Sequence, residues 1–304
     1  MSEKTQHIDI CIASYKRPQL LGRLLKSIAN QRIPIGVTVG IIVVDNDPAG
    51  SAVDVVQNAS RAGQPVRYFM QPKKNIALTR NMAAANADGE YIAYIDDDEY
   101  AEENWLTHLY DTLQKYQADM VFGPVICEVP ENAPSWLVNG RFFEWKRYKT
   151  GTEIPGRGTG NVLIRADSIP DRRAPFNPKY GLSGGEDTDF FRRMQMTGAK
   201  LIWCDEAVAR ETLVPERFSV GFLIRRAFRH GQIFAEIYVK PKSLLRKVPW
   251  FFYRIVLVVI ALIGALVSWP FRKAWGIKCF QKVASNVGQL SSVFPYRYQE
   301  YGEN

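Results

Sequence analysis

The chain has 304 residues, 46% of them hydrophobic, and a formal net charge of +8 at pH 7. That hydrophobic content can build a packed core in one large domain or two small ones, which excludes an intrinsically disordered chain. The excess positive charge lies in residues 225–304, which hold 13 Lys and Arg against 3 Asp and Glu. Such a segment could bind nucleic acid, an anionic membrane surface or a phosphorylated substrate.

Strand-like and helix-like segments alternate over the first 126 residues. Apolar, β-branched runs predict strands, and apolar residues at helical spacing predict helices between them. The strands are expected at 7–14, 37–47, 65–70, 90–96 and 118–126, and the helices at 17–30, 52–60, 76–87 and 101–116. This alternation predicts an α/β domain with a mostly parallel sheet, whose binding crevice lies outside the carboxyl ends of its strands.

Residues 130–185 are rich in Pro, Gly and aromatic residues. They predict loops and short strands that cover one edge of the sheet. A helix at 184–198, a strand at 199–205 and a basic helix at 218–239 are expected to follow. The first 14 residues contain no apolar run typical of a signal peptide, so we expect the catalytic part to stay in the cytosol.

Residues 248–271, "VPWFFYRIVLVVIALIGALVSWPF", carry one charge, Arg254, and Ile255 to Val267 has no polar side chain. The segment is about long enough to cross a bilayer, with Trp250 and Trp269 at the two interfaces and basic flanks that would meet lipid headgroups. A re-entrant or interfacial helix and a buried core helix are the alternatives. We expect this segment to associate with a membrane. Because the basic residues adjoin it and no recognition motif accompanies them, we expect no nucleic-acid partner.

Four acidic residues, Asp96, Asp97, Asp98 and Glu99, follow the predicted strand 90–96. Oxygen ligands spaced in this way suit a hard divalent cation, Mg²⁺ or Mn²⁺. The alternative is a solvated loop leading into the acidic first turn of a helix, and we interpret Glu99 as such a helix-entry acid. Neither the glycine fingerprint of a dinucleotide-binding domain nor a P-loop lysine occurs at the places where those folds need them.

A second acidic pair, Glu186 and Asp187, follows Gly184 and Gly185 at a predicted helix start. The pair could serve chemistry at the same crevice, or it could simply stabilise the first turn of the helix. The basic residues of the next predicted helix also have two interpretations: they could bind a diphosphate, or they could face solvent or a membrane. These residues are Arg225, Arg226, Arg229 and His230.

Four motifs in this order resemble the family 2 glycosyltransferases: "SYKRP", "VVDND", "NIALTRNMAAANADGEYIAYIDDD" and "GGEDTDFF". The resemblance covers about residues 8–235 and is strongest to the bacterial exopolysaccharide branch, which includes the succinoglycan-type β-1,4-glucosyltransferases. It implies the GT-A fold, which binds nucleotide sugars. It also implies an inverting, metal-dependent enzyme, and we expect it to transfer glucose from UDP-glucose.

Residue roles also follow from the resemblance. Ser14, Tyr15 and Arg17 would line the nucleotide site, Asp45 would hydrogen-bond the base, and Arg80 would sit beside the nucleotide.

In the acidic cluster, Asp96 would lie near the ribose and the Mg²⁺ or Mn²⁺ ion, and Asp98 would bind the ion directly. Asp97 would support them or face the donor sugar, and Asp187 would be the general base. Many relatives supply a further His ligand that this chain lacks, so Glu211 or His230 could take its place.

The acceptor implied is a polyprenyl-diphosphate-linked saccharide at the cytoplasmic face of the inner membrane, used in exopolysaccharide biosynthesis. Two alternatives stay open: a polyprenyl-phosphate sugar synthase, and a catalytically silent membrane module that binds sugar or nucleotide. The expected division is a GT-A catalytic domain at 1–217 and a basic helical segment at 218–247. A transmembrane or re-entrant/interfacial helix at 248–271 and a C-terminal tail at 272–304 would follow.

Overall fold

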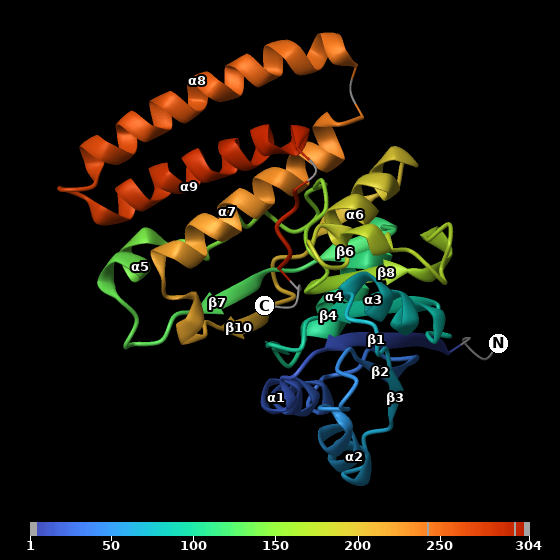
Figure 1. The fold of residues 1–304 in the computed structure, drawn as a ribbon. Helices are drawn as coiled ribbons and strands as arrows, with labels where there is room; N and C mark the ends of the chain where they lie inside the picture. Colours follow the sequence, from blue (N-terminus) through green and yellow to red (C-terminus); the bar gives the residue numbers. More distant parts are fainter. Residues whose placement is uncertain (1–4, 242, 295, 301–304) are drawn as a thin grey trace. The chain divides into compact units, whose positions relative to one another are not determined.

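The structure is a computed structural model that describes residues 5–241, 243–294 and 296–300. It consists of two units (Figure 1). Unit 1 comprises Met1–Glu128, Trp145–Leu182 and Glu186–Thr212, and unit 2 comprises Val129–Glu144, Ser183–Gly185 and Leu213–Asn304. The expected boundary at residue 217 stays a prediction.

A seven-stranded sheet forms the centre of unit 1, in the order β3-β2-β1-β4-β8-β6-β9. Its strands are β1 (Gln6–Ser14), β2 (Val37–Asp45), β3 (Val66–Met70), β4 (Tyr91–Ile95), β6 (Met120–Phe122), β8 (Asn161–Arg165) and β9 (Leu201–Trp203). All neighbouring strands pair in parallel except β8, which is antiparallel to both β4 and β6. The predicted α/β class with a mostly parallel sheet is confirmed.

The sheet of unit 1 is buried on both faces, because side chains alternate along each strand. Along β1, Ile8, Ile10 and Ile12 pack into one core while Cys11 packs into the other. Helices α1 and α4 contribute to the first core, and α3 and α6 to the second. The helices of unit 1 are α1 (Pro18–Ala29), α2 (Val53–Arg61), α3 (Ile76–Ala85), α4 (Trp105–Tyr116) and α6 (Glu186–Met196), with short 3₁₀ turns at Ala166–Ser168 and Pro178–Tyr180.

Two sequence expectations about unit 1 are wrong. Residues 130–185 do not merely cover an edge, because β8 inserts into the middle of the sheet. The strand expected at 118–126 is two strands, β6 and β7 (Val125–Glu128), which belong to different sheets. Gly123 and Pro124 separate them, and a Cβ at Gly123 would lie 2.1 Å from the carbonyl oxygen of Ala207. Since a proline has no N–H for a strand ladder, the first strand ends there.

A second sheet, with order β5-β10-β7, was not predicted. Strand β5 (Glu99–Ala101) pairs antiparallel with β10 (Ala209–Thr212), which pairs in parallel with β7. The interpretation of Glu99 as a helix-entry acid is therefore wrong. Glu99 begins a strand, is buried, and lies opposite Glu211 in the β5–β10 register, while α4 starts six residues later.

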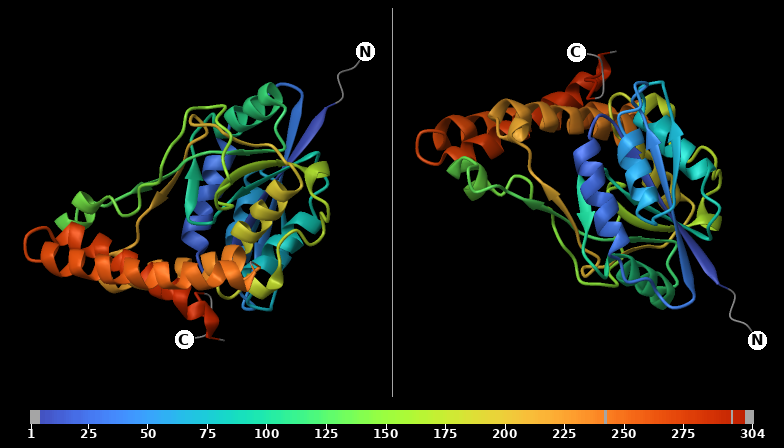
Figure 2. Two further views of the ribbon diagram at one scale, coloured as in Figure 1. Left: turned by 90° about the horizontal axis from the view of Figure 1, so that it is seen from above. Right: turned by 90° about the horizontal axis from the view of Figure 1, so that it is seen from below.

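Helices α7 (Val220–Phe234), α8 (Leu244–Ser268) and α9 (Lys273–Leu290) form a layer in unit 2, which we call the C-terminal helical layer (Figure 1). Helix α9 packs against both others and lies between them. In both views of Figure 2 the three helices overlap, so the layer is seen along its edge. Unit 2 also holds α5 (Ser135–Gly140), a π-helical turn at Ala235–Val239 and 3₁₀ turns at Pro215–Arg217 and Ser291–Val293.

Two glycines bring α7 and α9 close together. A Cβ at Gly231 would lie 2.0 Å from the carbonyl oxygen of Ser285, and one at Gly288 would lie 2.1 Å from that of Phe228. Helix α9 occupies most of the segment that the sequence analysis assigned to a tail. Helix α8 is long and apolar enough to cross a membrane, as the sequence predicts, and no other helix among the described residues is.

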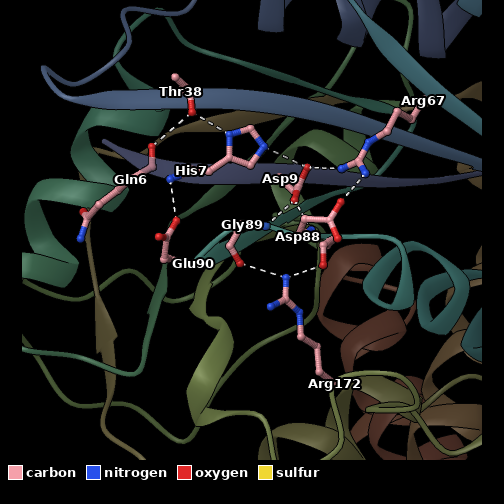
Figure 3. Close-up of polar contacts among 10 residues, drawn as sticks. Gln6, His7, Asp9, Thr38, Arg67, Asp88, Gly89, Glu90 and Arg172 are labelled. Atoms are coloured by element: carbon pink, nitrogen blue, oxygen red, sulfur yellow. Dashed lines mark hydrogen bonds and ion pairs between the residues drawn. The ribbon is translucent and has the colours of Figure 1, made fainter. Parts of the chain in front are cut away.

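A polar network joins β1 to its neighbours in unit 1 (Figure 3). The carboxylate of Asp9 is fully buried and accepts hydrogen bonds from Arg67 Nη2 at 2.6 Å and from the backbone N–H groups of Asp88 and Gly89 at 2.7 and 2.8 Å. Arg172 reaches the same turn and donates to the carbonyl oxygens of Ala87 and Gly89. The network fixes the turn that leads into β4 against β1 and β3.

We expect Asp9→Asn to lower the free energy of unfolding by about 2 kcal/mol, because a buried acceptor of three hydrogen bonds, one of them charged, loses its charge. The matched control is Asp88→Asn, which removes the other carboxylate bound by Arg67. That carboxylate is 83% exposed, so the change should cost less than about 1 kcal/mol. Urea unfolding at pH 7 measures both, and equal effects would contradict the role given to Asp9.

Candidate active site

Polar side chains of unit 1 gather where three neighbouring parallel strands end. Ser14 is the last residue of β1, Asp45 is the last of β2, and the acidic cluster follows β4 directly. The register places Ser14 beside Asp45. The carboxyl ends of neighbouring parallel strands form the usual binding crevice of such sheets. The structure thus brings together the predicted residues that follow these strands.

Asp97 ties the start of α1 to the end of β4. Its buried carboxylate accepts hydrogen bonds from Ser14 Oγ at 2.9 Å, Tyr15 N at 3.3 Å and Arg17 Nη1 at 3.1 Å. Burial raises the pKa of Asp97 to about 6, although Arg17 and the Ser14 hydroxyl act in the opposite direction. Asp97 therefore shapes the turn that carries Ser14, Tyr15 and Arg17.

Positive charge surrounds that turn. Arg17 also donates to Asp98 Oδ2 at 2.9 Å, so one guanidinium holds two members of the acidic cluster. The Tyr15 ring lies 5.3 Å from Lys16 Nζ and 4.9 Å from Lys74 Nζ. Such a turn suits an anionic ligand with an aromatic contact. Lys74 was not singled out from the sequence, because its place beside Tyr15 depends on the loop before α3.

Arg80 links the acidic cluster to the start of α6. Its side chain, on α3, donates to Asp96 Oδ1 at 2.8 Å and to Glu186 Oε1, and the residue is only 7% exposed. Burial raises the pKa of Glu186 despite the nearby Arg80. Glu186 Oε2 is buried with no hydrogen-bond partner in the described part of the chain. Arg80 therefore fixes the positions of two carboxylates that the sequence assigned to separate motifs.

Asp187 lies in the first turn of α6, directly after Glu186. Thr188 holds one of its oxygens, because the backbone N–H and the hydroxyl donate to Oδ1 at 2.6 and 3.2 Å. The other oxygen, Oδ2, accepts no hydrogen bond from the described residues and lies toward Gly158, where a Cβ would be 3.2 Å away. The half-buried Asp187 thus offers one carboxylate oxygen to a ligand.

The loop before β8 contacts both acidic groups. While Gly158 approaches Asp187, a Cβ at Gly160 would lie 2.4 Å from Glu99 Oε1 and 3.3 Å from Asp96 Oδ2. The pKa of Glu99 is raised well above its usual range by burial and by its acidic neighbours Asp96, Asp98 and Glu211. The sequence analysis counted these glycines only as part of the Pro- and Gly-rich segment 130–185. Their use here is to leave room for carboxylates.

Asp45 has a structural role that the sequence analysis did not predict. Its buried carboxylate accepts hydrogen bonds from Asp47 N at 2.9 Å, Ala52 N at 2.8 Å and the Tyr68 hydroxyl at 3.3 Å. These bonds brace the turn between β2 and α2. Its role toward a nucleotide base stays a prediction, as does the place of Arg80 beside the nucleotide.

The acidic cluster has the donor chemistry of a hard cation site. Asp96 and Asp98 offer carboxylate oxygens only, which suits Mg²⁺ or Mn²⁺. No group of three acidic, His or Cys side chains close enough to hold a metal ion occurs within residues 5–241, 243–294 and 296–300. Glu211 acts electrostatically on Glu99, whereas His230 belongs to unit 2, where burial and then Arg229 and Arg226 lower its pKa to about 3. Asp96 and Asp98 therefore fit a hard cation in donor chemistry, and the described residues bring no third acidic, His or Cys side chain close enough to complete the site.

The sequence matches the family described as "Glycosyl transferase family 2" over residues 9–172. The chain belongs to glycosyltransferase family 2. It is 34% identical to the succinoglycan biosynthesis protein ExoM of Rhizobium meliloti (strain 1021), over 81% of this chain and 80% of that protein. A Campylobacter jejuni GalNAc(5)-diNAcBac-PP-undecaprenol beta-1,3-glucosyltransferase is 27% identical over 75% of this chain and 65% of its own length. The chain is accordingly an enzyme, a glycosyltransferase.

Solved structures confirm the expected GT-A fold. The mannosyltransferase PcManGT of Pyrobaculum calidifontis, solved with GDP-Man and Mn²⁺, matches with a TM-score of 0.64 at 16% identity, over 96% of this chain and 88% of that one. S. aureus TarS 1-349, solved with UDP, matches with a TM-score of 0.56 at 16% identity, over 93% and 91% of the two chains. At such low identity these likenesses establish the fold alone.

We expect Arg80→Met to lower the free energy of unfolding by about 3 kcal/mol, because Glu186 is then buried without its cation. Arg32→Met is the matched control, since Arg32 pairs with Glu103 at 2.7 Å on the exposed surface and should contribute less than about 1 kcal/mol. Urea unfolding at pH 7 compares the two. Similar losses of unfolding free energy in both variants would show that burial does not increase the contribution of Arg80 to stability.

We expect Gly160→Ala to reduce glycosyl transfer at least about tenfold. The new methyl group would lie 2.4 Å from Glu99 Oε1, so the loop or the acidic cluster must shift, and small misplacements at a reacting centre are costly. Gly22→Ala in α1 is the control, because its Cβ would meet only Val55 at 3.7 Å. Initial rates at saturating donor test this, and full activity in Gly160→Ala would contradict the close fit of the loop.

Proposed function

We propose that this chain is an inverting, metal-dependent glycosyltransferase that moves glucose from UDP-glucose onto a lipid-linked saccharide in exopolysaccharide assembly. The observation that carries this proposal is the double ion pair of Arg80. It ties Asp96, a candidate metal ligand, to Glu186, the neighbour of the candidate base Asp187. One buried guanidinium thereby holds Asp96 to Glu186, the residue directly before Asp187 in the first turn of α6.

The donor binds at the turn after β1. Ser14, Tyr15 and Arg17 line the nucleotide, with Asp45 near its base, and Arg17 and Lys74 supply positive charge for its diphosphate. Asp96 and Asp98 would hold a divalent cation, Mg²⁺ or Mn²⁺, and the bound ion would supply positive charge to stabilise the departing diphosphate. TarS has been solved with UDP and with UDP-GlcNAc, which supports a uridine nucleotide.

Asp187 acts on the acceptor. Its Oδ2 takes the proton of the acceptor hydroxyl while that oxygen forms a bond to the anomeric carbon of the donor sugar. The bond from this carbon to the diphosphate oxygen breaks with its electron pair, which leaves UDP. Attack opposite the leaving group inverts the anomeric configuration. Thr188 holds Oδ1, so the carboxylate is already oriented for the transfer.

The acceptor is a polyprenyl-diphosphate-linked saccharide at the cytoplasmic face of the membrane. The Campylobacter jejuni relative is named for an undecaprenol-linked substrate, which supports a lipid-linked acceptor, and ExoM is named for succinoglycan biosynthesis, which supports a role in polysaccharide assembly. The apolar helix α8 and the basic charge around it support a membrane location.

We expect Asp187→Asn to reduce transfer by at least about a thousandfold while UDP-glucose binding stays within about twofold, because the amide cannot accept the proton. The matched control is Asp189→Asn, two residues along the same helix, where the carboxylate pairs with Arg193 instead. Radiolabelled product and calorimetric donor binding separate the two quantities.

Near-normal turnover of Asp187→Asn would reject Asp187 as the base. A mild loss with a polyprenyl phosphate as acceptor would point instead to a sugar synthase, because a phosphate acceptor needs little proton removal. No UDP release with any donor would indicate a catalytically silent binding module.

We expect nucleotide release from one donor only, UDP-glucose, in a panel of UDP- and GDP-sugars tested with Mn²⁺ and a membrane extract as acceptor. Chelation with EDTA should abolish the release, and added Mn²⁺ should restore it. Asp98→Asn should weaken Mn²⁺ binding measured by titration in the presence of UDP. Release that survives EDTA would contradict the metal dependence.

A further inference from the structure

The apolar residues of α8 divide into two faces. The inner face packs along α9 and is built from small or half-buried residues. Ala261 and Ala265 are buried there, and a Cβ at Gly264 would lie 3.4 Å from Cys279 Sγ of α9. The charge of Arg254 also points inward, because Arg254 Nη1 donates to Asn286 Oδ1 of α9 at 3.0 Å. Helix α8 is therefore joined to α9 by both packing and a polar contact.

The outer face of α8 is uniformly apolar and exposed. It covers about half of the helix circumference, and its large side chains have between 39% and 88% of their surface accessible. Monomeric soluble proteins rarely expose so large a continuous apolar surface. This face consists of Leu245, Val248, Phe252, Tyr253, Ile255, Val256, Val259, Ile260, Leu262, Ile263, Leu266 and Val267.

Helix α9 is too polar to accompany α8 into hydrocarbon. It carries Lys273, Lys278 and Lys282, all exposed, together with the buried amides of Asn286 and Gln289. Each charged side chain at the centre of a bilayer costs about 3 kcal/mol on insertion scales. If α8 crossed a bilayer with its partner attached, these groups would enter the membrane. If it crossed alone, the contact between Arg254 and Asn286 and the packing of the small residues would be lost.

The charge pattern opposes a crossing helix as well. Residues 240–247, which precede α8 and form its first turn, and residues 272–282 after it each contain four Lys or Arg, and the sequence holds no Asp or Glu from 237 to 299. Segments that cross a membrane keep an excess of basic residues on one side. The two flanks of α8 hold equal numbers of basic residues. This pattern favours a helix whose two ends lie at the same membrane surface, where anionic headgroups attract both flanks.

We propose that α8 lies in the plane of the membrane surface, with its outer face in the acyl boundary of an anionic leaflet and α9 above it. Lys282 of α9 and Lys278, whose Nζ lies 5.9 Å from the centroid of the Phe142 ring, then meet lipid phosphates, and the exposed Trp275 of the same helix sits at the headgroup level. The occupant of the apolar face is thus a lipid surface rather than a second copy of this chain, because the basic residues around it would repel a like-charged copy.

The decisive test compares the two ends of α8 in cells. Single cysteines at Ser243 and Arg272, in a Cys127→Ser, Cys279→Ser background, are labelled with a membrane-impermeant maleimide in spheroplasts and in inverted membrane vesicles. We expect both to react only in inverted vesicles, because both ends lie on the cytoplasmic side. Labelling of the two positions from opposite sides would show that α8 crosses the membrane and would overturn the inference.

A second test uses the purified full chain and vesicles that contain phosphatidylglycerol. An environment-sensitive fluorophore at position 256, 259 or 263 should be quenched by lipid-borne quenchers, whereas the same probe at 257 or 261, on the face toward α9, should not. Quenching at all five positions would indicate crossing. A sedimenting dimer without vesicle binding would assign the face to a second copy of this chain, and would also overturn the inference.

Charge variants complete the design. Lys278→Gln and Lys282→Gln should each weaken binding to anionic vesicles about fivefold, while Lys26→Gln on α1 of unit 1 is the control and should leave it unchanged. Unchanged binding in both α9 variants would contradict the placement of α9 at the headgroups. None of these measurements requires glycosyl transfer, so they fail or succeed separately from the Asp187 experiment that tests the proposed reaction.

Discussion

The buried guanidinium of Arg80 is the contact on which the proposed chemistry of unit 1 depends. A charge with so little exposure is tolerated only because two carboxylates share it, Asp96 after β4 and Glu186 at the start of α6. Those carboxylates belong to loops that are otherwise separate. The ion pairs therefore set the spacing between the donor end of the crevice and the helix turn that carries Asp187.

The sequence predicted the α/β class and the gathering of polar residues at the carboxyl ends of the strands because both follow from local patterns. Strands such as β1 and β2 have long runs of β-branched residues, and a parallel sheet places the polar residues after them at one edge. The order of four motifs supplied the family. The pairing of Arg80 with Glu186 could not be predicted, since the two residues are 106 positions apart and neither motif implies its partner.

The errors in the prediction share a physical cause. Strands β5, β6 and β7 are three or four residues long, too short for side-chain alternation to separate them from loops, and their order depends on contacts between distant segments. The sequence analysis placed β8 at the edge because the segment before it is rich in glycine. Glycine is needed in that segment because Gly160 lies close to Glu99 and Asp96. These carboxylates come close to the glycines only in the folded chain, so local sequence patterns could not predict the contact.

In unit 2, the packing of the apolar helix α8 against α9 limits the ways in which α8 can bind a membrane. By length and composition α8 qualifies as a membrane span, and composition alone leaves its orientation open. The packing of α9 restricts the orientation of α8, because Gly231 and Gly288 let the backbones of α7 and α9 lie in direct contact. To insert α8 across a bilayer would require pulling α9 from α7 or carrying its lysines into hydrocarbon. A surface-bound helix avoids both costs, so the small residues on α7 and α9 bear on the membrane topology of α8.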